Sequence, residues 1–241
     1  MTKTLLVTGA SSDTGIALLR KIYPHYGCIF AHYCHMSSDL EKLQVEIGEP
    51  LHLLQADFTK EEEIRQMLLA IDEIGCVPNH IVHIPAQKTV NQRFHKTTWQ
   101  EYNLAMETAL ASIIMILGKY IPHMSRQKYG KIVFMLTAYT LNIPPKYQTP
   151  YVVSKYALLG LMKSLAVEYA EKGIMVNGVS PNMMETKFLD DIPDMVKEQS
   201  AAKSPLRRIL QVEDVVPTFE YLLSDAADTV TGQNIGIMDI M

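Results

Sequence analysis

The sequence has little of what a disulfide framework or a metal site needs. Among its 241 residues are three cysteines, Cys28, Cys34 and Cys76, an odd number without the spacing of a metal-binding motif. His32 and His35 lie close to Cys34, but no further ligands converge on them, so a metal site is the minor alternative. We expect reduced, mostly packed thiols and no metal, as in a cytoplasmic protein.

Long runs of one charge and long apolar runs are also missing. The formal net charge is −4 and no five or six like charges stand together, which argues against a nucleic-acid partner. The N-terminal apolar run is too short for a signal peptide, and the longest apolar stretch, Ala109–Leu117, is too short to cross a bilayer. We therefore expect a soluble, cytoplasmic protein with no membrane partner.

Strand-like and helix-like patterns alternate along the whole chain. Hydrophobic residues make up 48% of it, and no linker or repeat divides it. The alternation predicts an α/β fold in one domain, residues 1–241, with a doubly wound, seven-stranded parallel sheet and helices on both faces. The predicted strands are Thr4–Thr8, Cys28–His32, His52–Gln55, His80–Ile84, Lys131–Leu136, Met175–Ser180 and Asn234–Met238. The predicted helices are Gly15–Tyr23, Ser38–Ile47, Lys60–Ile74, Thr97–Ser125, Pro150–Glu171 and Val212–Leu223.

Tyr151 and Lys155 stand four residues apart in the predicted helix Pro150–Glu171. On a helix this spacing places the phenol and the ammonium on one face, about one turn apart. A nearby cation lowers the pKa of a phenol from its usual value of about 10, which suits proton donation to a carbonyl oxygen. Such a pair can also arise by chance, so its weight depends on the rest of the chain.

The first predicted strand leads into a loop of small residues that opens a helix, Thr8-Gly9-Ala10-Ser11-Ser12-Asp13-Thr14-Gly15-Ile16. Gly9 permits a tight turn, and Gly15 lets backbone amides at the helix N-terminus approach a pyrophosphate. An ordinary capped turn has the same pattern, and Asp13 opposes a phosphate unless its carboxylate turns away to cap the helix. The loop is therefore a candidate anion site.

With these features the chain resembles the short-chain dehydrogenase/reductase family, most closely its 3-oxoacyl-acyl-carrier-protein reductase branch. Thr8, Gly9 and Gly15 match the glycine-rich loop of the family, with Asp13 in place of the middle glycine. The resemblance covers nearly the whole chain and is closest from Gly130 to Thr186. It implies a Rossmann fold, an NAD(P)(H) cofactor, and reversible hydride transfer between a ketone and a secondary alcohol.

The resemblance assigns the proton transfer to Tyr151 as general acid and base. Lys155 would lower the pKa of Tyr151 and hold the nicotinamide ribose, and Asn103 would hold a water in a proton relay. Thr137 takes the place of the catalytic serine of the family, with an interval to Tyr151 of 151 − 137 = 14, one longer than usual. Threonine keeps a hydroxyl that can donate to a substrate carbonyl.

Neighbouring hydroxyls and departures from the family leave alternatives open. Tyr139 or Thr140 could present the hydroxyl in place of Thr137. Asp13 and the turn His83-Ile84-Pro85-Ala86, which replaces Asn-Asn-Ala-Gly, are compatible with a divergent member that has lost redox activity and acts as a scaffold. A non-redox enzyme of the epimerase or dehydratase type is the third interpretation.

The resemblance also implies a set of cofactor contacts. They are Gly9, Ser11, Ser12, Gly15, Ile16, His35, Asp57, Phe58, Pro85, Ala86, Tyr151, Lys155, Pro181 and Thr186. Asp57 would contact the adenine amino group and Thr186 the nicotinamide carboxamide, although Thr59 could also cap the helix that follows. No acid follows the second strand, which favours NADP(H) over NAD(H), with His35 and Ser37 as candidate contacts to the 2′-phosphate.

Residues 183–204 are expected to form an irregular or short-helical substrate lid. Phe188 and Leu189 within it suggest an apolar pocket for a carbonyl or alcohol substrate, either free or carrier-bound. Family members are dimers or tetramers, and surplus apolar residues such as Ile114 fit a homodimer or homotetramer here.

Overall fold

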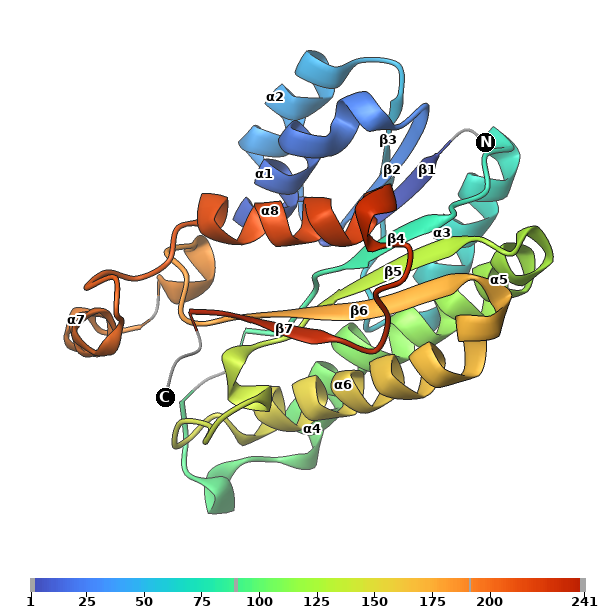
Figure 1. Ribbon diagram of the computed structural model, residues 1–241. Coiled ribbons are helices and arrows are strands. Elements are labelled where there is room, and N and C mark those ends of the chain that lie inside the picture. Colours follow the sequence, from blue (N-terminus) through green and yellow to red (C-terminus); the bar gives the residue numbers. More distant parts are fainter. Residues whose placement is uncertain (1–2, 89–90, 191, 239–241) are drawn as a thin grey trace.

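Seven parallel strands form one sheet in the order β3-β2-β1-β4-β5-β6-β7 (Figure 1). The computed structural model describes residues 3–88, 91–190 and 192–238. This is the predicted doubly wound sheet, and each predicted strand is present within a few residues. The strands are β1 (Thr4–Thr8), β2 (Cys28–Tyr33), β3 (Leu51–Gln55), β4 (His80–His83), β5 (Gly130–Met135), β6 (Ile174–Pro181) and β7 (Asn234–Ile237).

The helices also follow the predicted order, with one division and one addition. The predicted helix from Thr97 is divided by a π-helical turn, Glu107–Ala111, and the 183–204 segment contains a regular helix, α7. The helices are α1 (Asp13–Ile22), α2 (Ser38–Ile47), α3 (Glu61–Ile74), α4 (Trp99–Met106), α5 (Ser112–Gln127), α6 (Thr149–Tyr169), α7 (Asp194–Lys203) and α8 (Val212–Leu223).

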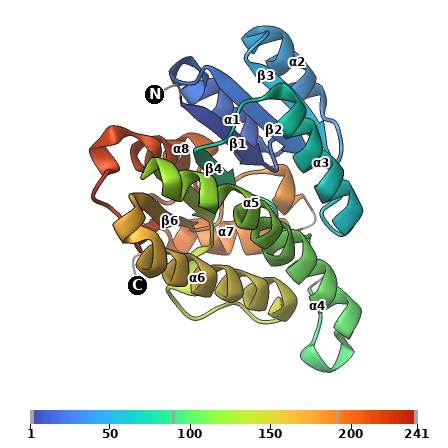
Figure 2. The same ribbon diagram turned by 90° about the vertical axis from the view of Figure 1, so that its right-hand side faces the viewer.

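Helices cover both faces of the sheet and bury two hydrophobic cores. α1, α2 and α8 lie on one face, and α3, α5 and α6 lie side by side on the other (Figure 2). All five residues of β1 and all six of β5 are buried. Strands covered on both faces are expected to be continuously apolar rather than alternating, which explains why their sequence patterns were easy to find.

Local sequence sets where most helices begin and end. Ser37 caps α2, and its Oγ accepts a hydrogen bond from the Leu40 amide. Thr98 and Glu101 form a reciprocal capping box at α4. α3 ends at Gly75, which has a φ of +78° that glycine adopts without a steric penalty.

The continuous helical run Trp99–Gln127 is, by length and composition, apolar enough to cross a membrane. The sequence analysis considered only Ala109–Leu117, which is too short to cross a bilayer, and so missed the longer helical run that contains it. In the structure the run packs on the sheet, and Ile113, Ile116 and Tyr120 of α5 are buried in the core with α3 and α6. The run is thus at least in part a core helix of the fold.

Candidate active site

The candidate site lies where the strand order reverses. β1 leads into α1 on one face of the sheet, whereas β4 leads into α4 and α5 on the other. In doubly wound sheets this divergence opens a crevice beyond the carboxyl ends of the strands. The glycine loop after β1, the 183–204 segment after β6 and the start of α6 all lie at this end of the sheet (Figure 1).

α6 presents Tyr151 and Lys155 together. The helix begins at Thr149 with Pro150 in its first turn, where a missing N–H removes no helical hydrogen bond. The Lys155 side chain is buried, and its Nζ donates to the Met135 carbonyl over 2.7 Å. The same Nζ lies 5.8 Å from the centroid of the Tyr151 ring. The phenol and the ammonium therefore meet at the carboxyl end of β5.

Burial shifts the pKa of both groups toward the neutral form. It lowers the pKa of Lys155 to about 7 and raises the pKa of Tyr151 to about 12. A smaller interaction with the Thr137 hydroxyl lowers the pKa of Tyr151. The expectation that Lys155 brings the pKa of Tyr151 down is wrong for this arrangement, because desolvation dominates and the ammonium is directed to Met135. At neutral pH Tyr151 is a protonated phenol.

Three hydroxyls were considered as the partner of Tyr151, and the geometry favours Thr137. Its hydroxyl interacts with the Tyr151 phenol. The Thr140 hydroxyl donates to the Thr137 carbonyl at 2.8 Å and lies 3.2 Å from Ser180 Oγ, so it is engaged inside the protein. Tyr139 meets the Tyr151 ring edge to face, with centroids 6.4 Å apart.

Asn103 lies in α4, just before the π-helical turn. Its carbonyl accepts the amide of Glu107, its side chain is partly buried, and α4 packs against α6. The carbonyl of Ala109 in the π turn accepts a hydrogen bond from His83 Nε2 at 2.9 Å. Turns of this kind are often found at functional sites, and the sequence pattern of the long helix gave no sign of this one.

The glycine loop has the backbone of an anion cradle. Gly9 has a φ of +74°, and a Cβ on Gly15 would lie 2.7 Å from the backbone at the start of the loop. Ser12 caps α1, because its Oγ accepts from the Gly15 amide at 3.1 Å. The amides of Asp13 and Thr14 meet no hydrogen-bond acceptor among the described residues. They are therefore available to an anion at the positive end of α1.

Asp13 is directed at the 183–204 segment and does not cap α1. Its Oδ2 accepts from the Lys187 amide at 2.7 Å, and its Oδ1 lies 3.6 Å from Lys187 Nζ. The same ammonium lies 3.1 Å from Asp39 Oδ2 at the start of α2. These contacts fasten the 183–204 segment to the glycine loop.

Two buried histidines hold the start of the glycine loop from the neighbouring strands. The Gly9 amide donates to His32 Nδ1 at 3.1 Å, and His32 Nε2 donates to the Ala56 carbonyl at 2.9 Å. Thr8 Oγ1 lies 2.8 Å from His83 Nδ1, while His83 Nε2 donates to the π turn. Because a carbonyl can only accept, these geometries assign the proton of each neutral ring to Nε2.

Phe58 and Ile16, two of the expected cofactor contacts, have buried side chains. The Phe58 ring stacks on His32, with centroids 3.8 Å apart and planes 6° from parallel, and lies 6.4 Å from His83. Burial lowers the pKa of His32 to about 4 and that of His83 to about 3. Both ring nitrogens of His32 are engaged, which removes it from the metal grouping considered above. The sequence gave no signal for this stack, because its rings come from three separate strand ends.

The residues expected around the adenosine are held by local hydrogen bonds. Asp57 Oδ1 accepts from both the amide and the hydroxyl of Thr59, at 3.0 and 2.8 Å. The N-cap residue of α3 is Lys60, so neither Asp57 nor Thr59 caps this helix. Ser37 caps α2 and also donates to the Ser11 carbonyl at 3.4 Å. His35 is exposed beside them.

The remaining expected contacts line the ends of β4 and β6. Pro85 packs on the glycine loop, and a Cβ on Gly9 would lie 3.2 Å from Pro85 Cγ. Ala86 follows it and is partly buried. Pro181 is buried at the end of β6, and Thr186 is partly buried at the start of the turn that carries Lys187.

Two aromatic rings flank Tyr151. Phe188 lies 6.0 Å from it, between ring centroids, and Tyr139 meets it from another side. Phe188 remains 39% exposed. The sequence suggested Phe188 as a pocket residue. Its contact with Tyr151, and the contacts of the neighbouring Lys187 with Asp13, join segments far apart in the sequence and could not be predicted from local residue spacing.

The residues present fit a nicotinamide dinucleotide. The glycine loop offers free amides at a helix N-terminus. Lys155 is buried, yet its ammonium meets one hydrogen-bond acceptor among the described residues, the Met135 carbonyl, and can donate two further bonds. Asp13 is the residue that opposes an anion, and Lys187 already matches its charge.

Gly15→Ala is expected to lower the free energy of unfolding by about 1–3 kcal/mol, because its Cβ would meet backbone atoms at 2.7 Å that cannot move without displacing α1. Gly118→Ala in α5 is the matched control: nothing lies within 4 Å of its Cβ, so it should be neutral or stabilising by about 0.5–1 kcal/mol. Urea denaturation measures both. Equal effects of the two substitutions would contradict the close packing of the loop.

Comparison with known proteins agrees with the resemblance found in the sequence. The sequence profile of the family described as enoyl-(acyl carrier protein) reductase matches residues 28–238. The 3-oxoacyl-(acyl-carrier-protein) reductase FabG of Staphylococcus aureus is 29% identical over 98% of this chain and 97% of its own. Among solved structures, ElxO with NADP bound has a TM-score of 0.86 at 22% identity, covering 98% of this chain and 97% of its own. The 3-ketoacyl-(acyl-carrier-protein) reductase of Brucella melitensis, complexed with NADH, has a TM-score of 0.86 at 20% identity, covering 98% and 96%.

Proposed function

Because the chain belongs to the short-chain dehydrogenase/reductase family, we propose that it is an NADP(H)-dependent oxidoreductase that interconverts a ketone and a secondary alcohol. The observation that carries the proposal is the meeting of Tyr151, Lys155 and Thr137 at the carboxyl end of β5, beside a glycine loop with free amides.

In the proposed reaction, four side chains act around the carbonyl group and the cofactor. Bound NADPH would supply a hydride to the carbonyl carbon. The Tyr151 Oη would give its proton to the carbonyl oxygen, and Thr137 Oγ1 would orient that oxygen by a hydrogen bond. Lys155 would hold the cofactor ribose with its two unused N–H bonds. Asn103 would support the water that returns a proton to Tyr151.

Carbonyl reduction needs Tyr151 in its protonated form, whereas oxidation of the alcohol needs the phenolate. Burial raises the pKa of Tyr151 to about 12, so at neutral pH the phenol carries the proton that reduction uses. We therefore propose carbonyl reduction as the main activity and Tyr151 as its proton donor.

The cofactor would be held by the glycine loop and by the strand ends that border the crevice. The proposed contacts are Gly9, Ser11, Ser12, Gly15, Ile16, His35, Asp57, Phe58, Pro85, Ala86, Tyr151, Lys155, Pro181 and Thr186. For Ile16 and Phe58, whose side chains are buried, any contact would come from the backbone. The exposed His35 and the lack of an acid directly after β2 favour NADP(H) over NAD(H).

Residues 183–204 would act as the lid over the substrate, within one domain formed by the whole chain. Phe188 and Tyr139 beside Tyr151 offer apolar surface to the carbonyl compound, either free or bound to an acyl carrier as in the relatives named acyl-carrier-protein reductases. We place the protein in the cytoplasm, with no nucleic-acid or membrane partner.

We further propose a homodimer or homotetramer built on α5 and α6. Apolar side chains lie exposed on the outer side of both helices: Ile114 of α5, and Tyr156 and Val167 of α6, are 49%, 44% and 82% exposed. An apolar helix needs cover on its second face. Val167→Asp should shift the mass in light scattering to that of a smaller species, whereas Val45→Asp, at an 86% exposed site on α2, should not. A monomeric wild-type protein would contradict the proposal.

The proposed activity is tested by following NADPH and NADH absorbance with a panel of ketones that includes a 3-oxoacyl thioester. Ketone-dependent oxidation of NADPH, faster than that of NADH, is the expected result. Binding of NADPH without turnover of any ketone would favour the scaffold interpretation, which Asp13 and the packing of Pro85 on the glycine loop keep as the second candidate.

A further inference from the structure

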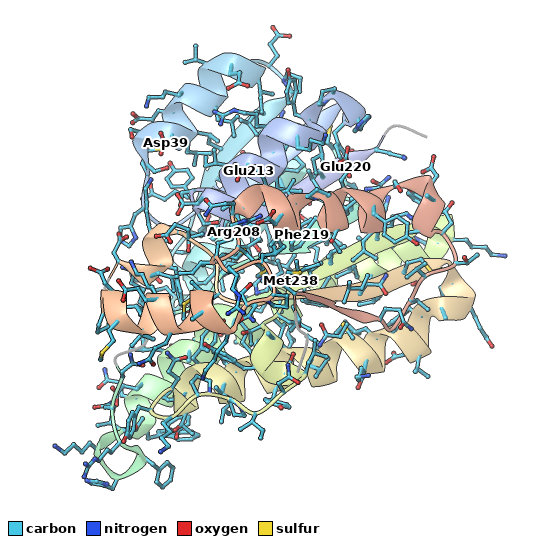
Figure 3. The ribbon with its side chains drawn as sticks, turned by 60° about the vertical axis from the view of Figure 1, so that its left-hand side comes forward. Asp39, Arg208, Glu213, Phe219, Glu220 and Met238 are labelled. Carbon is cyan, nitrogen blue, oxygen red and sulfur yellow. The ribbon has the colours of Figure 1, made fainter. Side chains whose placement is uncertain are left out.

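Lys187 holds a position that neither the resemblance nor the sequence pattern assigned. It follows Thr186, and both its backbone and its side chain reach across the crevice: the amide to Asp13 and the ammonium to Asp13 and Asp39. Figure 3 shows Asp39 on the part of α2 that faces the 183–204 segment. One cation thus links the lid, the glycine loop and the start of α2.

The local charge balance explains why a cation is needed here. Asp13 lies in the first turn of α1, next to the amides that are free to bind an anion, and Asp39 lies in the first turn of α2. Two carboxylates beside a pyrophosphate would repel it. The Lys187 ammonium holds the pKa of Asp39 below its ordinary value, and the two carboxylates raise the pKa of Lys187. Asp39 and Lys187 are therefore both charged at neutral pH.

The residues next to Lys187 connect this charge cluster to the chemical centre. Phe188 lies 6.0 Å from the Tyr151 ring, so two consecutive residues contact the glycine loop and the proposed proton donor. The base of the segment is fixed, because the Glu185 amide donates to the Leu210 carbonyl at 2.8 Å. Lys187 and Phe188 thus place the charge cluster and the Tyr151 ring contact at adjacent positions of one turn.

We propose that Lys187 is a cofactor-positioning residue. It offsets the negative charge of Asp13, and together with Lys42, 3.4 Å from Asp39 Oδ1, that of Asp39. When the dinucleotide binds, Lys187 turns to its phosphates and so couples cofactor binding to lid position. The inference rests on the proposed function, since it concerns the same cofactor site. It also explains how a loop with an aspartate in place of the middle glycine can still accept an anion.

An ordinary surface ion pair would behave differently. Lys187 is 65% exposed, and pairs of this kind contribute little to stability. Under the proposal, removing the ammonium leaves stability nearly unchanged but affects binding of a phosphate-bearing ligand, in a manner that depends on salt. Ligand affinity and its salt dependence therefore separate the two cases.

The test measures the Kd of NADPH and NADH by calorimetry for the wild type, Lys187→Met and the control Lys203→Met, an exposed lid lysine in α7. Lys187→Met is expected to weaken NADPH binding by about tenfold or more, the size of a charge-assisted hydrogen bond, and Lys203→Met to leave it unchanged. The difference should shrink between 50 and 500 mM NaCl, because salt screens exposed charges.

Asp13→Asn combined with Lys187→Met should recover part of the lost affinity, because the repelling carboxylate is then gone as well. Unchanged unfolding midpoints would show that the variants are folded. NADPH binding by Lys187→Met equal to that of the wild type, or a loss that salt does not alter, would overturn the inference while leaving the proposed function intact. A wild-type protein that binds neither nucleotide would overturn both.

Discussion

Tyr151→Phe is expected to lower kcat for ketone reduction by about 10²–10⁴-fold, because the reaction loses its proton donor, while the affinity for NADPH stays the same. The phenylalanine keeps the ring contacts with Tyr139 and Phe188, so the shape of the site is preserved. Steady-state kinetics gives the rate, and calorimetry gives the affinity.

The matched control is Tyr156→Phe, which removes a hydroxyl from the same helix at a 44% exposed position. It should react at the wild-type rate. If Tyr151→Phe also kept wild-type turnover, Tyr151 would have no part in the proton transfer, and Tyr139 would be the next phenol to examine.

Acid should destabilise the protein steeply between pH 6.5 and 5. His32, His80 and His83 are buried and neutral, and burial lowers their pKa values to about 4, 3 and 3. In the unfolded chain the pKa returns to about 6.5, so below that pH the unfolded state binds more protons than the folded state. The free energy of unfolding therefore decreases as the pH is lowered, by up to about 1.4 kcal/mol per pH unit for each histidine.

Urea denaturation at pH 6.5 and 5.0 measures this slope, in a range where most carboxylates remain ionised. His83→Asn should reduce the slope by about one histidine's share, since an amide can still accept from Thr8 but does not titrate. A wild-type stability that does not vary over this range would show that the three rings are not buried in neutral form.

The sequence was sufficient for the sheet because buried parallel strands are continuous apolar runs, bounded here by recognisable caps and turns. It was also sufficient for Tyr151 and Lys155 as a pair, since a spacing of four on a helix fixes their shared face. The sequence also limited the candidates for the substrate-orienting hydroxyl after β5 to Thr137, Tyr139 and Thr140. The structure favours Thr137, because the Thr140 hydroxyl is engaged with Ser180.

Contacts between distant elements could not be predicted in the same way. The pairing of Asp13 with Lys187 joins residues 174 positions apart, and no local pattern encodes such a contact. His32 and His83 act on the glycine loop from two different strands, and desolvation, which sets the pKa of Tyr151, is a property of the packed structure. Local spacing suggested that Lys155 would lower that pKa, and burial reversed the direction.

The most direct test of the account is calorimetric binding of NADPH and NADH to the purified protein, with Lys155→Ala as the comparison. The account predicts saturable binding of NADPH and weaker binding of NADH. Lys155→Ala should lose affinity, because the variant lacks the ammonium whose two unused N–H bonds would reach the cofactor. No binding of either nucleotide at millimolar concentration would contradict it, and would mean that Asp13 and Pro85 have closed the dinucleotide site.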